Sequence, residues 1–213
     1  MTLQPDPPDQ VLRGLWGFSA IHPEWEDDND GWEPEVAWWA LDTGDGVLLI
    51  DPLVEDWEGL DALVTGGGGC CGIIRTTYWH ERTIPQARAR YGTEVWARPG
   101  SSPDQRHPFD RPAPDGTELP GGVRAIDVVR DDEIALWLPD QKALVFGDVM
   151  LRDPSGKLSI CPESWIARSG GRGRVRQALE PLLELDPEHV LVSHGPLVKG
   201  DGPSALAEAL ATA

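Results

Sequence analysis

The chain has 213 residues, 40% of them hydrophobic, which is enough for one folded domain with a sizeable core and excludes an intrinsically disordered sequence. The formal net charge of -18 argues against nucleic acid or an anionic membrane surface as a partner, because both would repel the chain. No stretch approaches the roughly 20 apolar residues of a membrane span, and the polar start does not resemble a secretory signal. Three cysteines, two of them adjacent, favour reduced thiols and a cytoplasmic location.

Apolar runs and apolar–polar alternation predict strands along most of the chain. In chain order, the predicted strands cover residues 35–42, 47–50, 72–76, 94–97, 123–129, 133–138, 143–146 and 189–192. The first two are separated by a Gly44-Asp45-Gly46 turn and are expected to pair as a hairpin. Helical spacing predicts helices at residues 55–64, 83–91 (with Thr83 as the N-cap), 174–185 and 203–211.

This distribution of elements predicts a single domain over residues 1–213. Residues 1–34 are expected to form an N-terminal segment, residues 99–121 an irregular insertion rich in Pro, Asp and Gly, and residues 151–171 a loop-rich stretch. Strands dominate each half and helices separate them, which fits an α/β fold. The architecture we expect is a four-layer αββα sandwich, in which two sheets pack face to face and helices cover the outside.

Three residues with catalytic or metal-binding side chains each come shortly after a predicted strand. His80 follows the third predicted strand, Asp148 the seventh and His194 the last. A rigid strand fixes the loop that follows it, so catalytic groups are often found at such positions. Each residue alone could be an ordinary loop residue, but the ordered set of three predicts a shared pocket.

In this order the three residues resemble the motifs of the metallo-β-lactamase superfamily, over roughly residues 36–195. The first motif of the superfamily reads Thr-His-x-His-x-Asp-His, and the frame here is Thr77-Tyr78-Trp79-His80-Glu81-Arg82-Thr83. Only His80 keeps a metal-ligand position in this frame. A Gly-His pair that the family carries near the equivalent of residues 128–130 is also absent. The resemblance implies the αββα fold, with the active site at one edge between the sheets.

The resemblance also implies that the family's two-metal centre is incomplete here. Carried over position by position, His80 belongs to the first metal site, His194 to the second, and Asp148 lies between them. If they converge, they form a two-His, one-carboxylate set suited to one Zn, Mn or Fe ion, to which Glu81 could add an oxygen. Alternatively, the Arg82 guanidinium pairs with Asp148 and repels a metal. Both alternatives stay open, and the metal-free one is favoured slightly.

The resemblance implies a hydrolase-like protein that acts on a small ester, lactone, thioester or amide, and Arg82 suggests that this substrate is anionic. The expected catalytic residues are His80, Asp148, His194, Glu81, Arg82 and Tyr78. The expected substrate-binding residues are Arg82, Trp79, Glu163 and Trp165. The alternatives are a non-catalytic protein that binds a small molecule or a partner, and a metal-independent lyase or isomerase. A homodimer is compatible with the sequence.

Other aromatic, histidine and cysteine residues allow weaker expectations. Three of the ten tryptophans lie in polar or loop-like context and could line a pocket for an apolar ligand or anchor loops to the core: Trp25, Trp32 and Trp165. Three histidines stand beside proline or acidic residues and are expected at the surface: His22, His107 and His189. The segment after Asp148 could bring Cys161 or Glu163 into the pocket, or remain a solvated loop.

Overall fold

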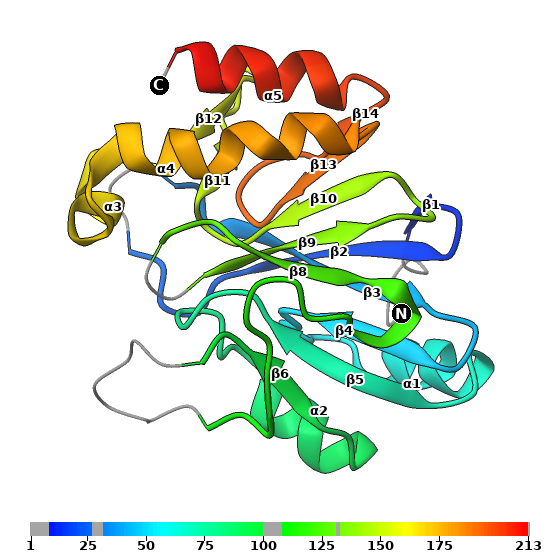
Figure 1. Ribbon diagram of the computed structural model, residues 1–213. Coiled ribbons are helices and arrows are strands. Elements are labelled where there is room, and N and C mark those ends of the chain that lie inside the picture. The colour runs from blue at the N-terminus through cyan, green and yellow to red at the C-terminus, as the bar shows by residue number, and fades with distance from the viewer. Residues whose placement is uncertain (1–8, 27–31, 100–107, 131–132, 213) are drawn as a thin grey trace.

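The computed structural model describes residues 9–26, 32–99, 108–130 and 133–212. Within these residues, two β-sheets pack face to face and helices lie on both outer faces (Figure 1). The chain therefore has the predicted α/β sandwich. His107, part of the N-terminal segment and part of the 99–121 insertion lie outside the described residues.

The first sheet has seven strands in the order β1-β2-β3-β4-β5-β6-β7. They are β1 (Asp9–Leu12), β2 (Leu15–Ile21), β3 (Glu35–Asp42), β4 (Val47–Ile50), β5 (Cys70–Arg75), β6 (Val95–Ala97) and β7 (Arg111–Pro112). The second sheet has the order β14-β13-β10-β9-β8. Its strands are β8 (Arg124–Asp127), β9 (Ile134–Leu138), β10 (Ala143–Phe146), β13 (His189–Val192) and β14 (Val198–Lys199). A separate hairpin pairs β11 (Met150–Arg152) with β12 (Leu158–Ile160).

Helices cover the two outer faces of this sandwich (Figure 1). Helices α1 (Trp57–Gly66) and α2 (Ile84–Tyr91) lie on the first sheet. Helices α4 (Gly171–Leu179) and α5 (Gly202–Ala211) lie on the second. The remaining helical segments are short: α3 (Glu163–Ile166), η1 (Pro120–Gly122), η2 (Ala167–Ser169) and η3 (Glu180–Leu185). None of the helices in the described part of the chain has the length and apolar character that a membrane span requires.

The apolar runs of the central strands are explained by burial on both faces. Successive side chains of a strand point to opposite faces, so a strand covered on both sides needs an unbroken apolar run. In β4, Leu48 and Ile50 face the core between the sheets, whereas Val47 and Leu49 face the helices α1 and α2. β10 alternates in the same way between the central core and the layer of α4 and α5. Three stacked apolar layers result.

The predicted strands at 35–42, 47–50, 143–146 and 189–192 are confirmed, and β3 pairs with β4 as an antiparallel hairpin. The helix predicted at 174–185 is wrong in part, because α-helix ends at Leu179 and continues as a 3-10 helix. Pro181 has no amide hydrogen to continue the α-helical pattern. The strands β1, β2, β7, β11, β12 and β14 were not predicted.

Backbone contacts join the two sheets at one edge. The amide of Ala37 in β3 donates to the carbonyl of Ser193 over 2.8 Å. The amide of Ile134 in β9 donates to the carbonyl of Thr76 over 2.9 Å. Ser193 and Thr76 both follow strands of the opposite sheet, so this edge brings the ends of several strands together.

Candidate active site

Parallel pairing of β10 with β13 places two of the three expected residues side by side. Phe146, the last residue of β10, is paired with Val192, the last residue of β13, and Asp148 and His194 each follow two residues later. His80 enters from the opposite sheet, on the loop between β5 and α2. The site therefore lies between the carboxyl ends of strands from both sheets, where loops on rigid strands position side chains well.

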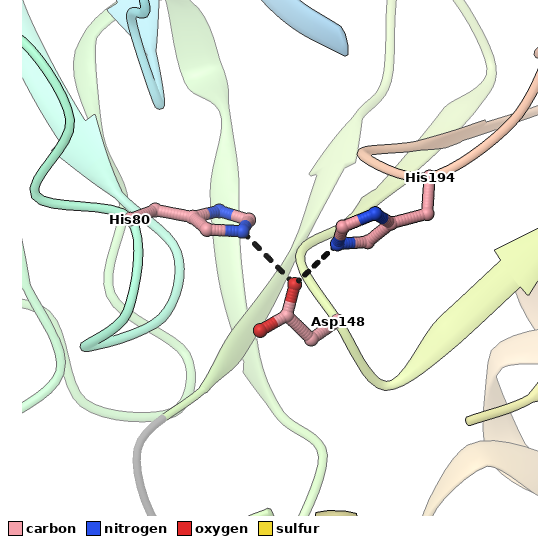
Figure 2. Close-up of side chains that lie close together, drawn as sticks. All are labelled: His80, Asp148 and His194. Carbon is pink, nitrogen blue, oxygen red and sulfur yellow. Dashed lines mark hydrogen bonds and ion pairs between the residues drawn. The ribbon is translucent and has the colours of Figure 1, made fainter. Parts of the chain in front are cut away.

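The three side chains converge on one oxygen atom. His80 Nε2 lies 2.9 Å and His194 Nε2 lies 3.2 Å from the same Oδ1 of Asp148, as Figure 2 shows. All three residues are buried, with exposed fractions of 3% for His80, 8% for His194 and 5% for Asp148. One ligand atom from each lies within 4.8 Å of the other two. The predicted set of three is thus a single buried cluster.

The other ring nitrogen of His80 is held by a carboxylate from the first sheet. Nδ1 lies 2.9 Å from Oδ2 of Asp51, at the end of β4. Asp51 is fixed in turn by the backbone amide of Thr76 at 2.7 Å and by a short hydrogen bond from the Thr76 hydroxyl. A carboxylate on Nδ1 fixes the orientation of the imidazole and directs Nε2 toward Asp148, as in many metal sites.

The pKa values of the two histidines in the cluster are shifted in opposite directions. Burial and the Arg82 charge disfavour protonation of His80, but Asp148 and Asp51 outweigh them, and the pKa of His80 is raised. Burial lowers the pKa of His194, which is therefore neutral near pH 7. Burial alone would raise the pKa of Asp148, but His80, His194 and Arg130 hold it well below its usual range. Asp148 is thus an anion in this pocket.

Two further charged residues, Arg130 and Glu133, belong to the cluster. Glu133 is fully buried, and its Oε1 accepts hydrogen bonds from the amides of Gly147, Asp148 and Val149 at 3.0, 3.1 and 3.1 Å. Its Oε2 lies 2.7 Å from Nη1 of Arg130, which also donates to Oδ2 of Asp148 over 3.1 Å. Burial raises the pKa of Glu133 to about 7. This role was not predicted from the sequence, where the available signal was a pair of oppositely charged residues shortly before the apolar strand β9.

Arg82 lies beside His80 and makes contacts other than the expected ones. Its Nη1 donates to the carbonyls of Ala37 at 3.0 Å and Asp51 at 2.9 Å, and its Nη2 lies 3.3 Å from His80 Nε2. The guanidinium that pairs with Asp148 at hydrogen-bond distance is that of Arg130. The structure therefore has an Arg130–Asp148 pair where the sequence suggested an Arg82–Asp148 pair. Arg82 is held instead by the carbonyls of Ala37 and Asp51.

The other expected site residues lie around this cluster in different settings. The Tyr78 ring packs edge-on against Trp79, with centroids 5.3 Å apart, and Trp79 is 65% exposed. Glu81 precedes Arg82 on the same loop and is partly buried. Glu163 is exposed on α3 and lies 3.8 Å from Arg172. Their expected roles in catalysis and substrate binding stay predictions.

A cavity of about 540 Å³ opens beside His194. Its lining includes Trp32, Leu151, Ile160, Pro162, Arg172 and Gly195. The His194 ring meets Trp32 at 5.0 Å and Trp165 at 6.0 Å, both edge-on. His22, expected at the surface, is partly buried with its ring 5.4 Å from Trp32. Of these aromatic residues, Trp32 lines the cavity itself, and His194 is the residue of the cluster that lines it.

The donor set fits one divalent ion and does not fit two. Two imidazole nitrogens and one carboxylate oxygen are a common ligand set for Zn, Mn or Fe(II). A second ion would need further anionic or imidazole ligands. Instead, the guanidinium groups of Arg82 and Arg130 lie against His80 and Asp148, and two cations at this distance repel another.

The cysteines give a prediction about reactivity. Cys161 is fully buried in the core layer of α4 and α5, neither in the cavity nor in a solvated loop. Burial raises the pKa of Cys161 to about 12 and of Cys70 to about 11, and also raises that of Cys71. Since the thiolate is the reactive form, we expect native protein at pH 8 to react slowly with DTNB, and all three thiols to react in guanidinium chloride. Fast reaction of the native protein would contradict this placement.

Comparisons with known proteins identify the fold. No family model and no curated protein matches the chain. Among solved structures, the DIM-1 metallo-β-lactamase superposes with a TM-score of 0.70 at 15% identity, with 96% of each chain covered. FIM-1 from Pseudomonas aeruginosa in its mono-zinc form gives 0.67 at 13%, over 95% of this chain and 93% of that one. A metallo-β-lactamase from Pontibacter korlensis gives 0.65 at 18%, over 96% of both. The chain has the metallo-β-lactamase fold.

Proposed function

We propose that this protein is a hydrolase-like enzyme in which His80, Asp148 and His194 hold one divalent ion. The substrate would be a small ester, lactone, thioester or amide. The observation that carries the proposal is the convergence of His80 Nε2 and His194 Nε2 on Oδ1 of Asp148. Such a set of three ligands leaves a coordination position open, as catalytic zinc sites do.

The ion, when bound, would polarise a substrate carbonyl and lower the pKa of a water molecule. The chain's own residues would orient these groups. Asp51 fixes the His80 ring through Nδ1, and the backbone carbonyls that hold Arg82 keep its charge beside His80. A fixed cation at this position would stabilise negative charge that develops on the substrate oxygen.

The cavity beside His194 would bind the rest of the substrate. Trp32, Leu151 and Ile160 give it an apolar lining, which suits an apolar or aromatic group. Two arginines (Arg152 and Arg172) and two acidic residues (Glu33 and Asp153) also line it, so it could pair with a charged group of either sign. Arg82, from which an anionic substrate was first expected, already donates to two carbonyls, and Arg172 donates to the carbonyl of Cys161 and lies 3.8 Å from Glu163.

Metal content and activity test this proposal together. We expect untagged protein to carry about one equivalent of Zn, Mn or Fe by inductively coupled plasma mass spectrometry, since the set supplies three ligands. A His80→Ala, Asp148→Ala double variant should carry none, while circular dichroism shows that it is folded. The same preparations are screened against nitrophenyl esters, lactones, thioesters and β-lactams. Absence of metal after reconstitution with each ion would rule out the metal-dependent form.

A second candidate is a metal-independent lyase or isomerase that uses the same acid–base pair. It is favoured by one observation, because Arg130 and His80 already supply positive charge to Asp148. In that case His80, oriented by Asp51, would move the proton. Turnover that survives dialysis against a chelator would favour this candidate, and ligand binding without any turnover would favour a non-catalytic protein.

A further inference from the structure

We infer that Arg130, held by Glu133, is a built-in counter-cation of Asp148 that competes with divalent ions and limits the centre to one of them. The inference deepens the proposed function and rests on it only for the presence of that one ion. Nothing in the sequence motifs assigns a role to Arg130 or Glu133.

The two oxygens of Asp148 have separate partners. Oδ1 faces the imidazoles of His80 and His194, at 2.9 and 3.2 Å. Oδ2 accepts from Nη1 of Arg130 at 3.1 Å. Oδ2 is the oxygen that could bridge to a second ion, and it is already paired with the Arg130 guanidinium. This group keeps its positive charge, because a guanidinium stays protonated in proteins.

Glu133 keeps this guanidinium in place. It lies 2.7 Å from Arg130 through Oε2, and through Oε1 it binds the three amides of residues 147–149. A Cβ at Gly147 would lie 2.6 Å from Thr76 Oγ1 and 3.2 Å from Oε1 of Glu133, so the loop is tightly enclosed. If Arg130 moved away, two buried carboxylates would lose a cationic partner, which is costly.

The backbone before Arg130 supports a dedicated role for this side chain. Val129 adopts φ +65, a left-handed conformation that is a genuine outlier for a β-branched residue. Asp127 Oδ1 stabilises it by accepting from the Val129 amide over 2.7 Å. Strain of this kind persists where the surrounding contacts fix it, and such positions cluster at functional sites.

A double-mutant cycle that removes the charges of Arg130 and Glu133 tests the inference, with the affinity for Zn²⁺ as the readout. Arg130→Met removes a cation beside Asp148, so we expect the apparent Kd for Zn²⁺ to fall by about tenfold or more. Glu133→Gln removes a nearby anion and should raise Kd by about tenfold. The double variant restores the net charge and should return to within about threefold of the wild type. Arg130→Lys keeps the charge and should resemble the wild type.

The measurement is isothermal titration calorimetry of metal-free protein with Zn²⁺ at pH 8. Arg111→Met is the matched control, since Arg111 pairs with Glu94 at 3.0 Å on the exposed edge strand β7, and its Kd should not change. Thermal unfolding with and without Zn²⁺ is the second readout. The ion should raise the melting temperature of Arg130→Met more than that of the wild type. If Arg130→Met does not fold, Glu133→Gln and the double variant still give both expected directions.

The possible outcomes separate the inference from the proposed function. Weaker binding in Arg130→Met, Glu133→Gln and their double variant alike, or two ions in the wild type, would overturn the counter-cation role. If the wild type binds no ion and Arg130→Met binds one, the proposed use of an ion fails while the competition by Arg130 is supported. If no variant binds an ion, both are overturned.

Discussion

Replacement of Asp148 by asparagine is expected to lower kcat/KM by about 10³-fold, within the range for loss of a group that orients a catalytic proton transfer or charge. Asparagine keeps the shape of the side chain but removes the charge that His80, His194 and Arg130 all contact. The NH₂ group of the asparagine amide would also be a hydrogen-bond donor among the donors of His80, His194 and Arg130. The bound metal should be lost with the activity, and both are measured on the same preparations.

Asp61→Asn is a suitable control for this prediction. Asp61 lies on α1 and accepts hydrogen bonds from Arg90 and Tyr91, on the other face of the first sheet from the cluster. Its replacement should leave kcat/KM within about twofold, as for a surface change remote from the site. If Asp148→Asn retained turnover, Asp148 would have no part in the reaction, whatever its contacts.

Replacement of Gly195 by alanine is expected to destabilise the protein by about 3 kcal/mol or more, which places it among the severe single substitutions. Gly195 has φ +90, and a Cβ there would lie 1.9 Å from the carbonyl oxygen of Arg152. The Arg152 amide donates to the His194 carbonyl over 2.9 Å, so the two segments cannot separate without loss of this bond. Urea unfolding monitored by tryptophan fluorescence measures the change.

Gly200→Ala separates the two causes of this effect. Gly200 also has a positive φ, +80, but a Cβ there would meet nothing within 4 Å. Its replacement should cost about 1 to 2 kcal/mol, from the left-handed backbone alone. Equal losses of unfolding free energy in the two variants would show that the close approach of Arg152 to residue 195 adds nothing to the cost of the left-handed backbone.

Elements buried on both faces were predictable from the sequence, and half-exposed ones were not. The strands β4 and β10 have uninterrupted apolar runs because both faces are covered. β2 has a mixed burial pattern and contains Gly17, a residue that weakens a strand prediction. The structure explains this glycine, since a Cβ would lie 2.9 Å from the Trp39 ring on β3. Contacts of this kind depend on a partner far along the chain.

The three central site residues were predictable because each follows a strand, but their charged partners were not. With 36 acidic and 18 basic residues in the chain, composition does not indicate which of them fold inward. Only Arg82 was expected to pair with Asp148, whereas the structure places Arg130 there. The choice between them depends on backbone conformation, because Arg82 has φ +42 and Arg130 follows Val129 at φ +65. Residue type does not indicate either conformation for an arginine or a valine.

The backbone contacts between the sheets have a mechanical consequence for the site. The amide of Ala37 bonds to Ser193, and the amide of Ile134 to Thr76, so main-chain atoms lock the sandwich beside His194 and Glu133. The two halves of the site are therefore joined by main-chain hydrogen bonds as well as by side-chain packing in the central core. Fluctuations in the distance between the two sheets would be largest at the edge opposite the site. Substitutions of side chains in the central core could then accumulate during evolution without moving His80 relative to Asp148.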